Sequence, residues 1–228
     1  GLLGAITLPE TEERKVRLLK GAGYNAIRSS HNPCSKALLD ACDRLGMLVV
    51  DEYADMWYIH KTRYDYAAYL PDRWKDDLRD MVDKNCNHPC VVLYSIGNEV
   101  SETAQPRGIQ LTENMTEYLH QLDDRPVTCG INIFFNFLSS IGFGVYSDKK
   151  AEQQAKKSQE QKRKPVKKKA VGSEFFNNLA GILGSDFMKF GATLGGSDRK
   201  SREAFARLDV AGYNYGEMRY RKDFRKYP

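Results

Sequence analysis

The chain has 228 residues, a length that fits one domain, and its content of 41% hydrophobic and 11% aromatic residues excludes a disordered protein. Its formal net charge of +5 is concentrated in residues 147–170, which hold 10 Lys or Arg and 3 Asp or Glu. The remaining residues hold 25 basic and 27 acidic side chains, so the fold itself is not basic and we expect no nucleic-acid partner.

Helix and strand signals alternate along the chain. The first helical segment is charged early and apolar later, and a glycine stops it. The second begins at Ser35, a capping residue, and ends at Gly46, and the third begins at Asp72 with apolar residues at helical spacing. The predicted helices lie at 10–20, 35–46, from Asp72 onward and at 107–122, and the predicted strands at about 24–30, 47–52, 91–97, 126–131 and 208–215.

Apolar strands that are each followed by an amphipathic helix predict an α/β fold with a parallel sheet covered by helices. A doubly wound sheet and a (β/α)8 barrel both show this pattern. No glycine-rich phosphate loop follows the first strand, which argues against the doubly wound sheet. Polar residues gather where the strands end, the face on which barrels carry their active sites. These strand-end groups are residues 28–31, 51–52, 98–99 and 214–215.

Residues 132–207 interrupt the alternation and predict a long insertion between two strands. The insertion contains the Lys-rich run and then an amphipathic segment, residues 174–194, that favours helix. We expect residues 148–169 to form a solvated, flexible and dispensable loop, because they combine like charge with few apolar side chains. The run also lacks the interleaved aromatic residues of a nucleic-acid contact.

Residues 126–147 carry no charge and reach the length of a membrane span, but Asn, Ser and Gly residues are scattered through them. They favour a strand that runs into a buried loop or short helix, and we expect no membrane partner. The first residues show no signal peptide, although a chain that begins with Gly looks cut from something longer.

The five cysteines predict reduced thiols and a cytoplasmic setting, because their number is odd and the chain is not short. The segment Cys86–Cys90 could be interpreted as a metal site. It lacks the usual C-x2-C spacing and a second ligand pair, so buried thiols and a capping histidine are the preferred interpretation.

The strand-end groups combine carboxylates with aromatic side chains, which suits sugars: rings stack on C–H faces and hydroxyls need acceptors. A glutamate at a strand end is also placed to transfer protons. The same residues fit structural roles, with Asp51 and Glu52 as caps and the histidine and tyrosines as core. The candidates are His31, Asp51, Glu52, Asp55, Glu99, Trp57, Tyr58, Tyr213 and Tyr215.

Three motifs, NAIRSSHNP (25–33), CDRLGMLVVDE (42–52) and NHPCVVLYSIGNE (87–99), resemble the catalytic barrel of glycoside hydrolase family 2, the β-galactosidase and β-glucuronidase family. The segments DEYADMWYIHKTRYDY (51–66) and DVAGYNYGEMRY (209–220) resemble its β-galactosidase-type members. The resemblance covers nearly all of residues 8–131 and 207–228, and it implies a retaining β-glycoside hydrolase with a (β/α)8 barrel.

The resemblance also implies residue roles. Glu99 is the expected general acid/base, at the end of the fourth barrel strand. The expected substrate-binding residues are Asn98 at the sugar 2-hydroxyl, His31, Arg28 beside the nucleophile, Asp55, Trp57, and either Tyr213 or Tyr215 near the nucleophile. No cofactor is expected, and a monovalent or divalent cation in the full enzyme is not assigned to any residue.

The chain departs from the family pattern because the nucleophilic glutamate of strand seven would follow the YP stretch at 227–228. The residues 1–228 look like a partial barrel domain, about strands two to six, without strand one and the preceding β-sandwich domains. We therefore expect the chain alone to be inactive and to leave Arg28 without its paired carboxylate. Expected partners are a carbohydrate substrate and the missing strands and domains, and a homo-oligomer stays open.

The favoured activity is that of a β-galactosidase. Within the family, β-glucuronidase or β-mannosidase is the alternative. A non-catalytic carbohydrate-binding protein on a decayed barrel is a further alternative, which the presence of Glu99 and His31 disfavours.

Overall fold

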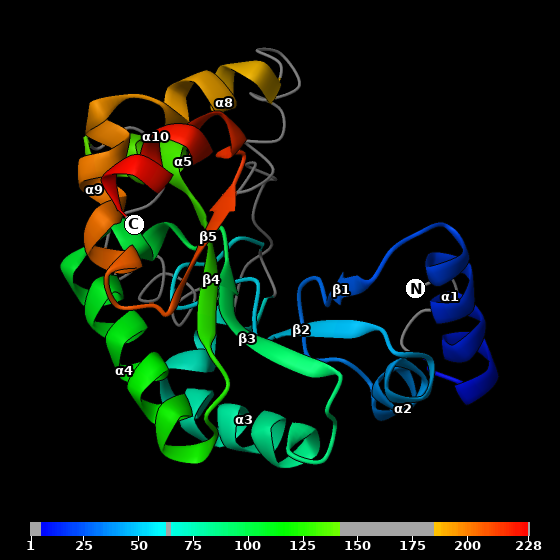
Figure 1. Ribbon diagram of the computed structural model, residues 1–228. Helices are drawn as coiled ribbons and strands as arrows, with labels where there is room; N and C mark the ends of the chain where they lie inside the picture. Colours follow the sequence, from blue (N-terminus) through cyan, green and yellow to red (C-terminus); the bar gives the residue numbers. More distant parts are fainter. Residues whose placement is uncertain (1–5, 63–64, 142–184, 228) are drawn as a thin grey trace, which may run out of the picture.

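The computed structural model describes residues 6–62, 65–141 and 185–227. Within these residues, five parallel strands form one sheet in which each strand lies beside its neighbours along the chain. The strands are β1 (Ala26–Arg28), β2 (Leu48–Glu52), β3 (Val91–Asn98), β4 (Val127–Asn132) and β5 (Val210–Asn214). The sheet curls (Figure 1), as part of a (β/α)8 barrel wall does, and a doubly wound sheet would instead reverse its strand order. The prediction of an incomplete barrel is confirmed.

Helices cover the outer, convex face of this sheet (Figure 1). The local signals explain their ends: the Ser35 side chain accepts a hydrogen bond from the Leu38 amide, and Gly46 takes the left-handed conformation, φ 67°, that ends the second helix. The third helix begins at Leu70, two residues before the predicted Asp72, because Pro71 fits a first helical turn. The helices are α1 (Pro9–Gly21), α2 (Lys36–Leu45), α3 (Leu70–Asn85), α4 (Pro106–Leu122), α5 (Ile133–Ser140), α8 (Ser185–Ala192), α9 (Gly195–Phe205) and α10 (Tyr220–Lys226).

Three short 3-10 helices complete the described elements: η1 (Tyr66–Ala68), η2 (Ser101–Ala104) and η3 (Glu217–Arg219). The loop between β2 and α3 contains η1, and η2 follows β3 directly. Both therefore lie at the carboxyl end of the sheet, where the strand-end polar residues also gather.

The predicted insertion, residues 132–207, is helical where it is described, with α5 at its start and α8 and α9 at its end. The uncharged stretch after residue 126 is the predicted strand followed by a short helix, as far as residue 141. No helix in the described ranges is both long and apolar enough to cross a membrane. The predicted flexible loop at 148–169 and the start of the predicted helix at 174–194 lie outside the described residues.

The hydrophobic core lies between the sheet and the helices. Helix residues such as Leu39, Leu78 and Leu119 have no exposed surface and pack with outward-facing strand residues such as Val49 and Tyr94. Each such apolar side chain contributes roughly 1.5–3 kcal/mol by burial. Within the described residues, this core therefore holds the strands together from their outer side.

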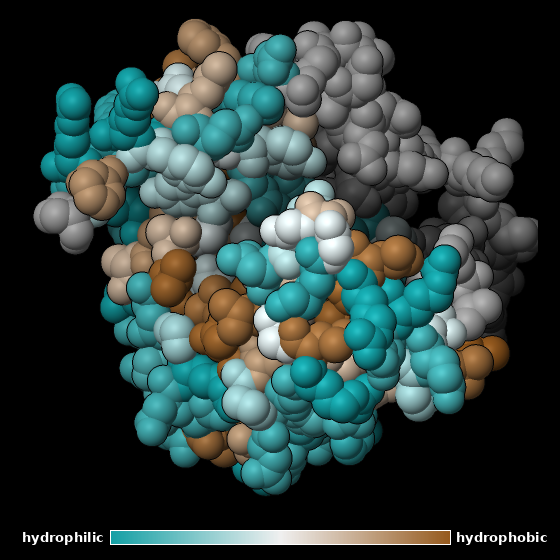
Figure 2. Space-filling view, turned by 45° about the vertical axis from the view of Figure 1, so that its right-hand side comes forward, coloured by the Kyte–Doolittle hydropathy of each residue, from teal (hydrophilic) through white to brown (hydrophobic). Residues whose placement is uncertain are grey.

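The inner face of the sheet is partly open in the described chain. Its strands retain exposed apolar side chains, with Leu48 44% and Val210 43% exposed. Figure 2 shows apolar side chains gathered near the middle of one face of the molecule, with polar residues around them. Because parallel sheets are normally covered on both faces, the exposed side chains of Leu48 and Val210 are ones that further barrel strands would cover.

Candidate active site

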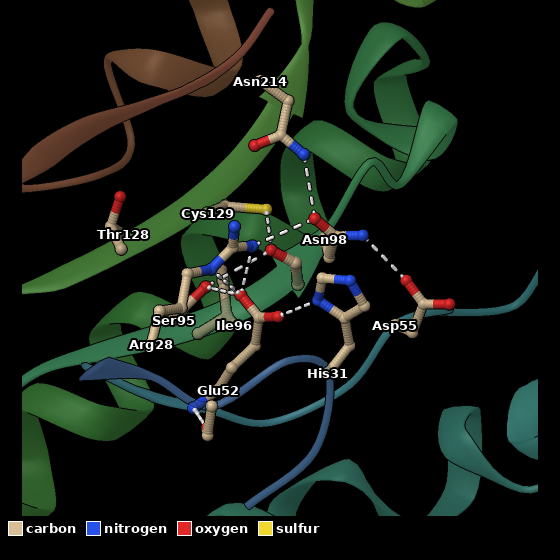
Figure 3. Close-up of polar contacts among 12 residues, drawn as sticks. Arg28, His31, Glu52, Asp55, Ser95, Ile96, Asn98, Thr128, Cys129 and Asn214 are labelled. Carbon is tan, nitrogen blue, oxygen red and sulfur yellow. Dashed lines mark hydrogen bonds and ion pairs between the residues drawn. The ribbon is translucent and has the colours of Figure 1, made fainter. Parts of the chain in front are cut away.

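The parallel register brings polar side chains from different strands together at the carboxyl end of the sheet. Glu52 on β2 lies opposite Ser95 on β3, and Asn98 on β3 lies opposite Gly130 on β4. With Arg28 from β1, these side chains form a connected network on the inner face, which Figure 3 shows. A barrel carries its active site at this end of its strands.

Glu52 is the buried centre of the network, with no exposed surface. Its Oε2 accepts hydrogen bonds from Arg28 Nε at 2.8 Å, from Arg28 Nη2 at 2.5 Å and from Ser95 Oγ at 2.7 Å. Its Oε1 accepts one from His31 Nδ1 at 2.6 Å. A buried carboxylate is tolerated only when it is paired in this way. The carboxylate that Arg28 is expected to pair with is that of the nucleophile; in the described chain Glu52 gives Arg28 a carboxylate partner from the neighbouring strand.

His31 is oriented by this bond. Because Nδ1 donates to Glu52, the opposite ring nitrogen, Nε2, lies on the side of the ring away from the carboxylate. The side chain is 36% exposed, so the ring is both held and accessible.

The amide of Asn98 is clamped from three directions (Figure 3). Its Oδ1 accepts from Arg28 Nη2 at 3.0 Å and from Asn214 Nδ2 at 2.9 Å, and its Nδ2 donates to Asp55 Oδ1 at 2.9 Å. The side-chain amide has two N–H groups, and this bond to Asp55 uses one. Asp55 Oδ1 also accepts from Lys61 Nζ at 2.8 Å, so the loop after β2 joins the network.

Glu99 follows the end of β3 in a left-handed conformation, with φ 47°. Its backbone N–H donates to the Gly130 carbonyl at 2.6 Å, and its Oε1 accepts from Asn132 Nδ2 at 2.9 Å. Non-glycine residues rarely adopt this φ, and such strain is characteristic of functional sites.

The structure places the two candidate tyrosines, Tyr213 and Tyr215, in different surroundings. The negative charge of Glu99, together with burial, raises the pKa of Tyr215, so this hydroxyl is within electrostatic range of the candidate acid/base. The Tyr213 hydroxyl instead donates to Asp223 Oδ2 at 2.8 Å, and its ring packs against Phe205 with centroids 5.0 Å apart. Tyr213 therefore does not join the network, whereas Tyr215 does lie beside it.

Trp57 supports the site from a buried position next to strand β3. It is fully buried, and its Nε1 donates to the Ile96 carbonyl at 2.9 Å. In the described chain the indole thus shows no surface to a ligand. It instead anchors the loop after β2 to the strand that ends in Asn98.

Sequence reasoning missed part of this network. For Glu52 it did not decide between a structural capping role and a role in the site. It assigned no role to four further residues of the network. Asn132 and Asn214 each end a strand, the same signal that singled out Asn98, whereas Ser95 and Lys61 offered no local signal. The additional network residues are Glu52, Lys61, Ser95, Asn132 and Asn214.

A groove of about 570 Å³ opens beside the network, between the loops after β1 and β2 and helix α3. Its lining includes His31 and Asp55 from the network and Tyr66, Asp77 and Lys84 beyond it. The network is therefore reachable from the surface on this side.

One cluster away from the network has the residue types of a metal site: Asp43, His88 and Cys90, whose potential ligand atoms lie within 4.8 Å of one another. Asp43 already accepts from His88 Nδ1 at 2.6 Å and from the Cys90 amide at 2.9 Å. Burial raises the pKa of the Cys90 thiol, which favours the protonated form, a poor ligand.

All five cysteines are free, as predicted, but Cys86 is exposed rather than buried, since it follows the last turn of α3 at the surface.

Comparison with known proteins places these residues in a family. The model of "Glycosyl hydrolases family 2, TIM barrel domain" matches residues 5–188. The β-galactosidase BoGH2A of Bacteroides ovatus is 48% identical over 102 residues, 45% of this chain and 12% of that protein. A putative β-glucuronidase of Formosa agariphila is 35% identical over 102 residues, 44% of this chain and 10% of that protein.

Among solved structures, a glycosyl hydrolase family 2 member from Bacteroides cellulosilyticus aligns with 100% of this chain and 21% of its own, with TM-score 0.69 and 35% identity. The chain thus spans only a small part of the relatives that it matches. Since the family model matches more than half of its residues, the chain belongs to glycosyl hydrolases family 2 and contains part of the TIM barrel domain of that family.

Proposed function

We propose that the protein containing this chain is a retaining β-glycosidase that hydrolyses terminal β-galactosides, with Glu99 as general acid/base. The observation that supports this best is the placement of Glu99. It stands at the end of β3 in a left-handed backbone conformation, directly after an Asn98 whose amide is held by three side chains. Such a carboxyl group can transfer a proton at a defined position.

In the proposed reaction, Glu99 protonates the oxygen of the leaving group while a second carboxylate attacks the anomeric carbon. Glu99 then removes a proton from water, which releases the sugar from the glycosyl-enzyme. Asn132, which donates to Glu99 Oε1 at 2.9 Å, orients the carboxyl group through both steps. The remaining N–H of Asn98 is available to a sugar hydroxyl, and His31 offers the free side of its ring.

Glu52 does not suit the role of nucleophile. It has no exposed surface, and Arg28, His31 and Ser95 already occupy its two oxygens. The family resemblance instead assigns the nucleophile to a glutamate C-terminal to Pro228. Glu52 then serves to hold Arg28 and His31 in place around the substrate.

Two observations favour a galactoside over a glucuronide. BoGH2A, at 48% identity, is a β-galactosidase. In addition, the two cationic side chains that this part of the structure brings into the network, Arg28 and Lys61, are paired with Glu52 and Asp55. A uronate carboxylate would need a cation that is not already neutralised. β-Glucuronidase is the second candidate, supported by the relative of that name in Formosa agariphila.

The test uses the full-length protein and its Glu99→Gln variant. With a poor leaving group, such as glucose in lactose, kcat/KM should fall by about 10²–10⁴, the usual contribution of general acid catalysis. With a dinitrophenyl galactoside, which needs little protonation, kcat/KM should fall far less. Glu113→Gln, on the outer surface of α4, is the matched control and should leave both values unchanged.

Equal losses on the two galactosides would count against the acid role of Glu99. The choice of sugar is tested separately, with nitrophenyl β-galactoside and nitrophenyl β-glucuronide and the unmodified protein. A higher kcat/KM for the glucuronide would replace the galactoside proposal by the second candidate.

A further inference from the structure

Lys61 lies in the loop between β2 and α3 and is only 8% exposed. Burial of an ammonium group is unfavourable unless its protons are bonded to acceptors. Its Nζ donates to the Asn98 carbonyl oxygen at 2.6 Å and to Asp55 Oδ1 at 2.8 Å. The ammonium group is thus directed at the residue that precedes the proposed acid/base.

The two bonds hold both the backbone and the side chain of Asn98. The carbonyl that Lys61 contacts belongs to the peptide group that joins Asn98 to Glu99. The N–H of the same peptide group, on Glu99, donates to the Gly130 carbonyl at 2.6 Å. Both polar ends of this peptide are therefore bonded. Through Asp55, which accepts from Asn98 Nδ2, Lys61 also supports the side-chain amide.

The orientation of this peptide matters for catalysis because it sets the backbone torsion of Glu99. Glu99 has φ 47°, a left-handed value that is unfavourable for an L-residue. A strained conformation persists only when its surroundings hold it. If the peptide rotates, the Glu99 side chain leaves the Asn132 amide and points elsewhere.

The loop that carries Lys61 is itself fastened on both sides of it. Before Lys61, the Ile59 amide donates to the buried carboxyl of Glu102 at 2.9 Å. After it, the carboxylate of Asp65 accepts from the amides of Lys61 and Thr62 at 2.6 and 2.8 Å. Lys61 is therefore presented to Asn98 by a preorganised loop.

We propose that Lys61 is a positioning residue for the reaction: it fixes the Asn98–Glu99 peptide and so directs the Glu99 carboxyl group at the leaving-group oxygen. The inference rests on the proposed acid/base role of Glu99. It makes Lys61 specific to the step that needs a proton, since its bond to the Asn98 carbonyl holds the peptide group that leads into Glu99.

The experiment compares the full-length protein with its Lys61→Met variant on aryl β-galactosides that run from dinitrophenyl through nitrophenyl to phenyl. Met keeps the length and apolar stem of the side chain but lacks the ammonium group. Relative to the unmodified protein, kcat/KM should fall at least tenfold more for the phenyl than for the dinitrophenyl substrate. Lys36→Met, with a side chain 72% exposed, is the matched control and should leave the series unchanged.

A merely structural role predicts a different result. Partial unfolding or weaker binding of the shared galactosyl group lowers kcat/KM by the same factor for every member of the series. If Lys61→Met shows equal losses of kcat/KM across the series while Glu99→Gln still shows leaving-group dependence, the inference is overturned. No activity in the unmodified protein would instead overturn the proposed function.

If Lys61→Met fails to fold, Lys61→Gln serves instead, because its side-chain amide can still donate to the Asn98 carbonyl without the charge. Its losses should be smaller but should again increase toward the phenyl substrate. Uniform losses in Lys61→Gln would equally overturn the inference.

Discussion

Gly130 offers a direct test of the polar network, because it faces the network from β4 and has no side chain. A Cβ atom built at this position would lie 2.7 Å from Arg28 Nη2 and 3.1 Å from Asn214 Oδ1. Ordinary contacts begin at 3.4 Å, so Gly130→Ala forces the guanidinium away from β4. Arg28 Nη2 is the end of a flexible side chain, and the chain should therefore still fold.

The expected loss follows from the bond that the displacement breaks. Arg28 Nη2 lies 3.0 Å from Asn98 Oδ1, and a retreat from β4 lengthens this contact beyond hydrogen-bonding range. A hydrogen bond to a charged group contributes about 1.5–3 kcal/mol. If Asn98 loses that support when it contacts the sugar, kcat/KM should fall roughly 10- to 150-fold.

The assay measures kcat/KM on nitrophenyl β-galactoside with the full-length protein, together with the melting temperature. Gly21→Ala is the control, because a Cβ atom there would meet nothing within 4 Å. It should leave kcat/KM unchanged and should not lower the melting temperature, since alanine favours the helix α1 that Gly21 ends. A folded Gly130→Ala variant with full activity would refute the reasoning, since the Arg28–Asn98 contact would then be dispensable.

Two further predictions concern the pH dependence of stability and the behaviour of residues 1–228 expressed alone. Burial raises the pKa of Glu102 from 4.5 to about 7. Between these two pH values the folded state keeps a proton that the unfolded state loses. The free energy of unfolding should therefore fall as the pH rises from 4.5 to about 7. Glu102→Gln should lack this decline, and melting temperatures measured across that range check it; parallel curves for the two proteins would disprove it. Residues 1–228 expressed alone should show no glycosidase activity and should associate through β1 and β5, the edge strands of the described sheet. Size-exclusion chromatography and a nitrophenyl galactoside assay test this, and an active monomer would contradict it.

The sequence by itself predicted the strands, the helices beside them and the end of the sheet that carries the site. These features depend on local patterns: buried parallel strands are apolar throughout, amphipathic helices repeat every 3.6 residues, and polar residues stand where each strand ends. Glu99 and Asn98 were found in this way, because both follow a single apolar run. The third helix begins at Leu70, two residues before the predicted start at Asp72, because its first turn accommodates a proline.

The tertiary structure decided which side chains meet. Nothing near Glu52 in the sequence shows that Arg28 and Ser95 will reach it, because those contacts depend on the register between strands. Tyr213 and Tyr215 are two residues apart and would share a face in a regular strand. However, β5 ends at Asn214 and Tyr215 has φ 55°, so the alternation breaks and only Tyr215 lies near Glu99. Strand periodicity is local, whereas register and the backbone turn after a strand depend on packing between distant segments.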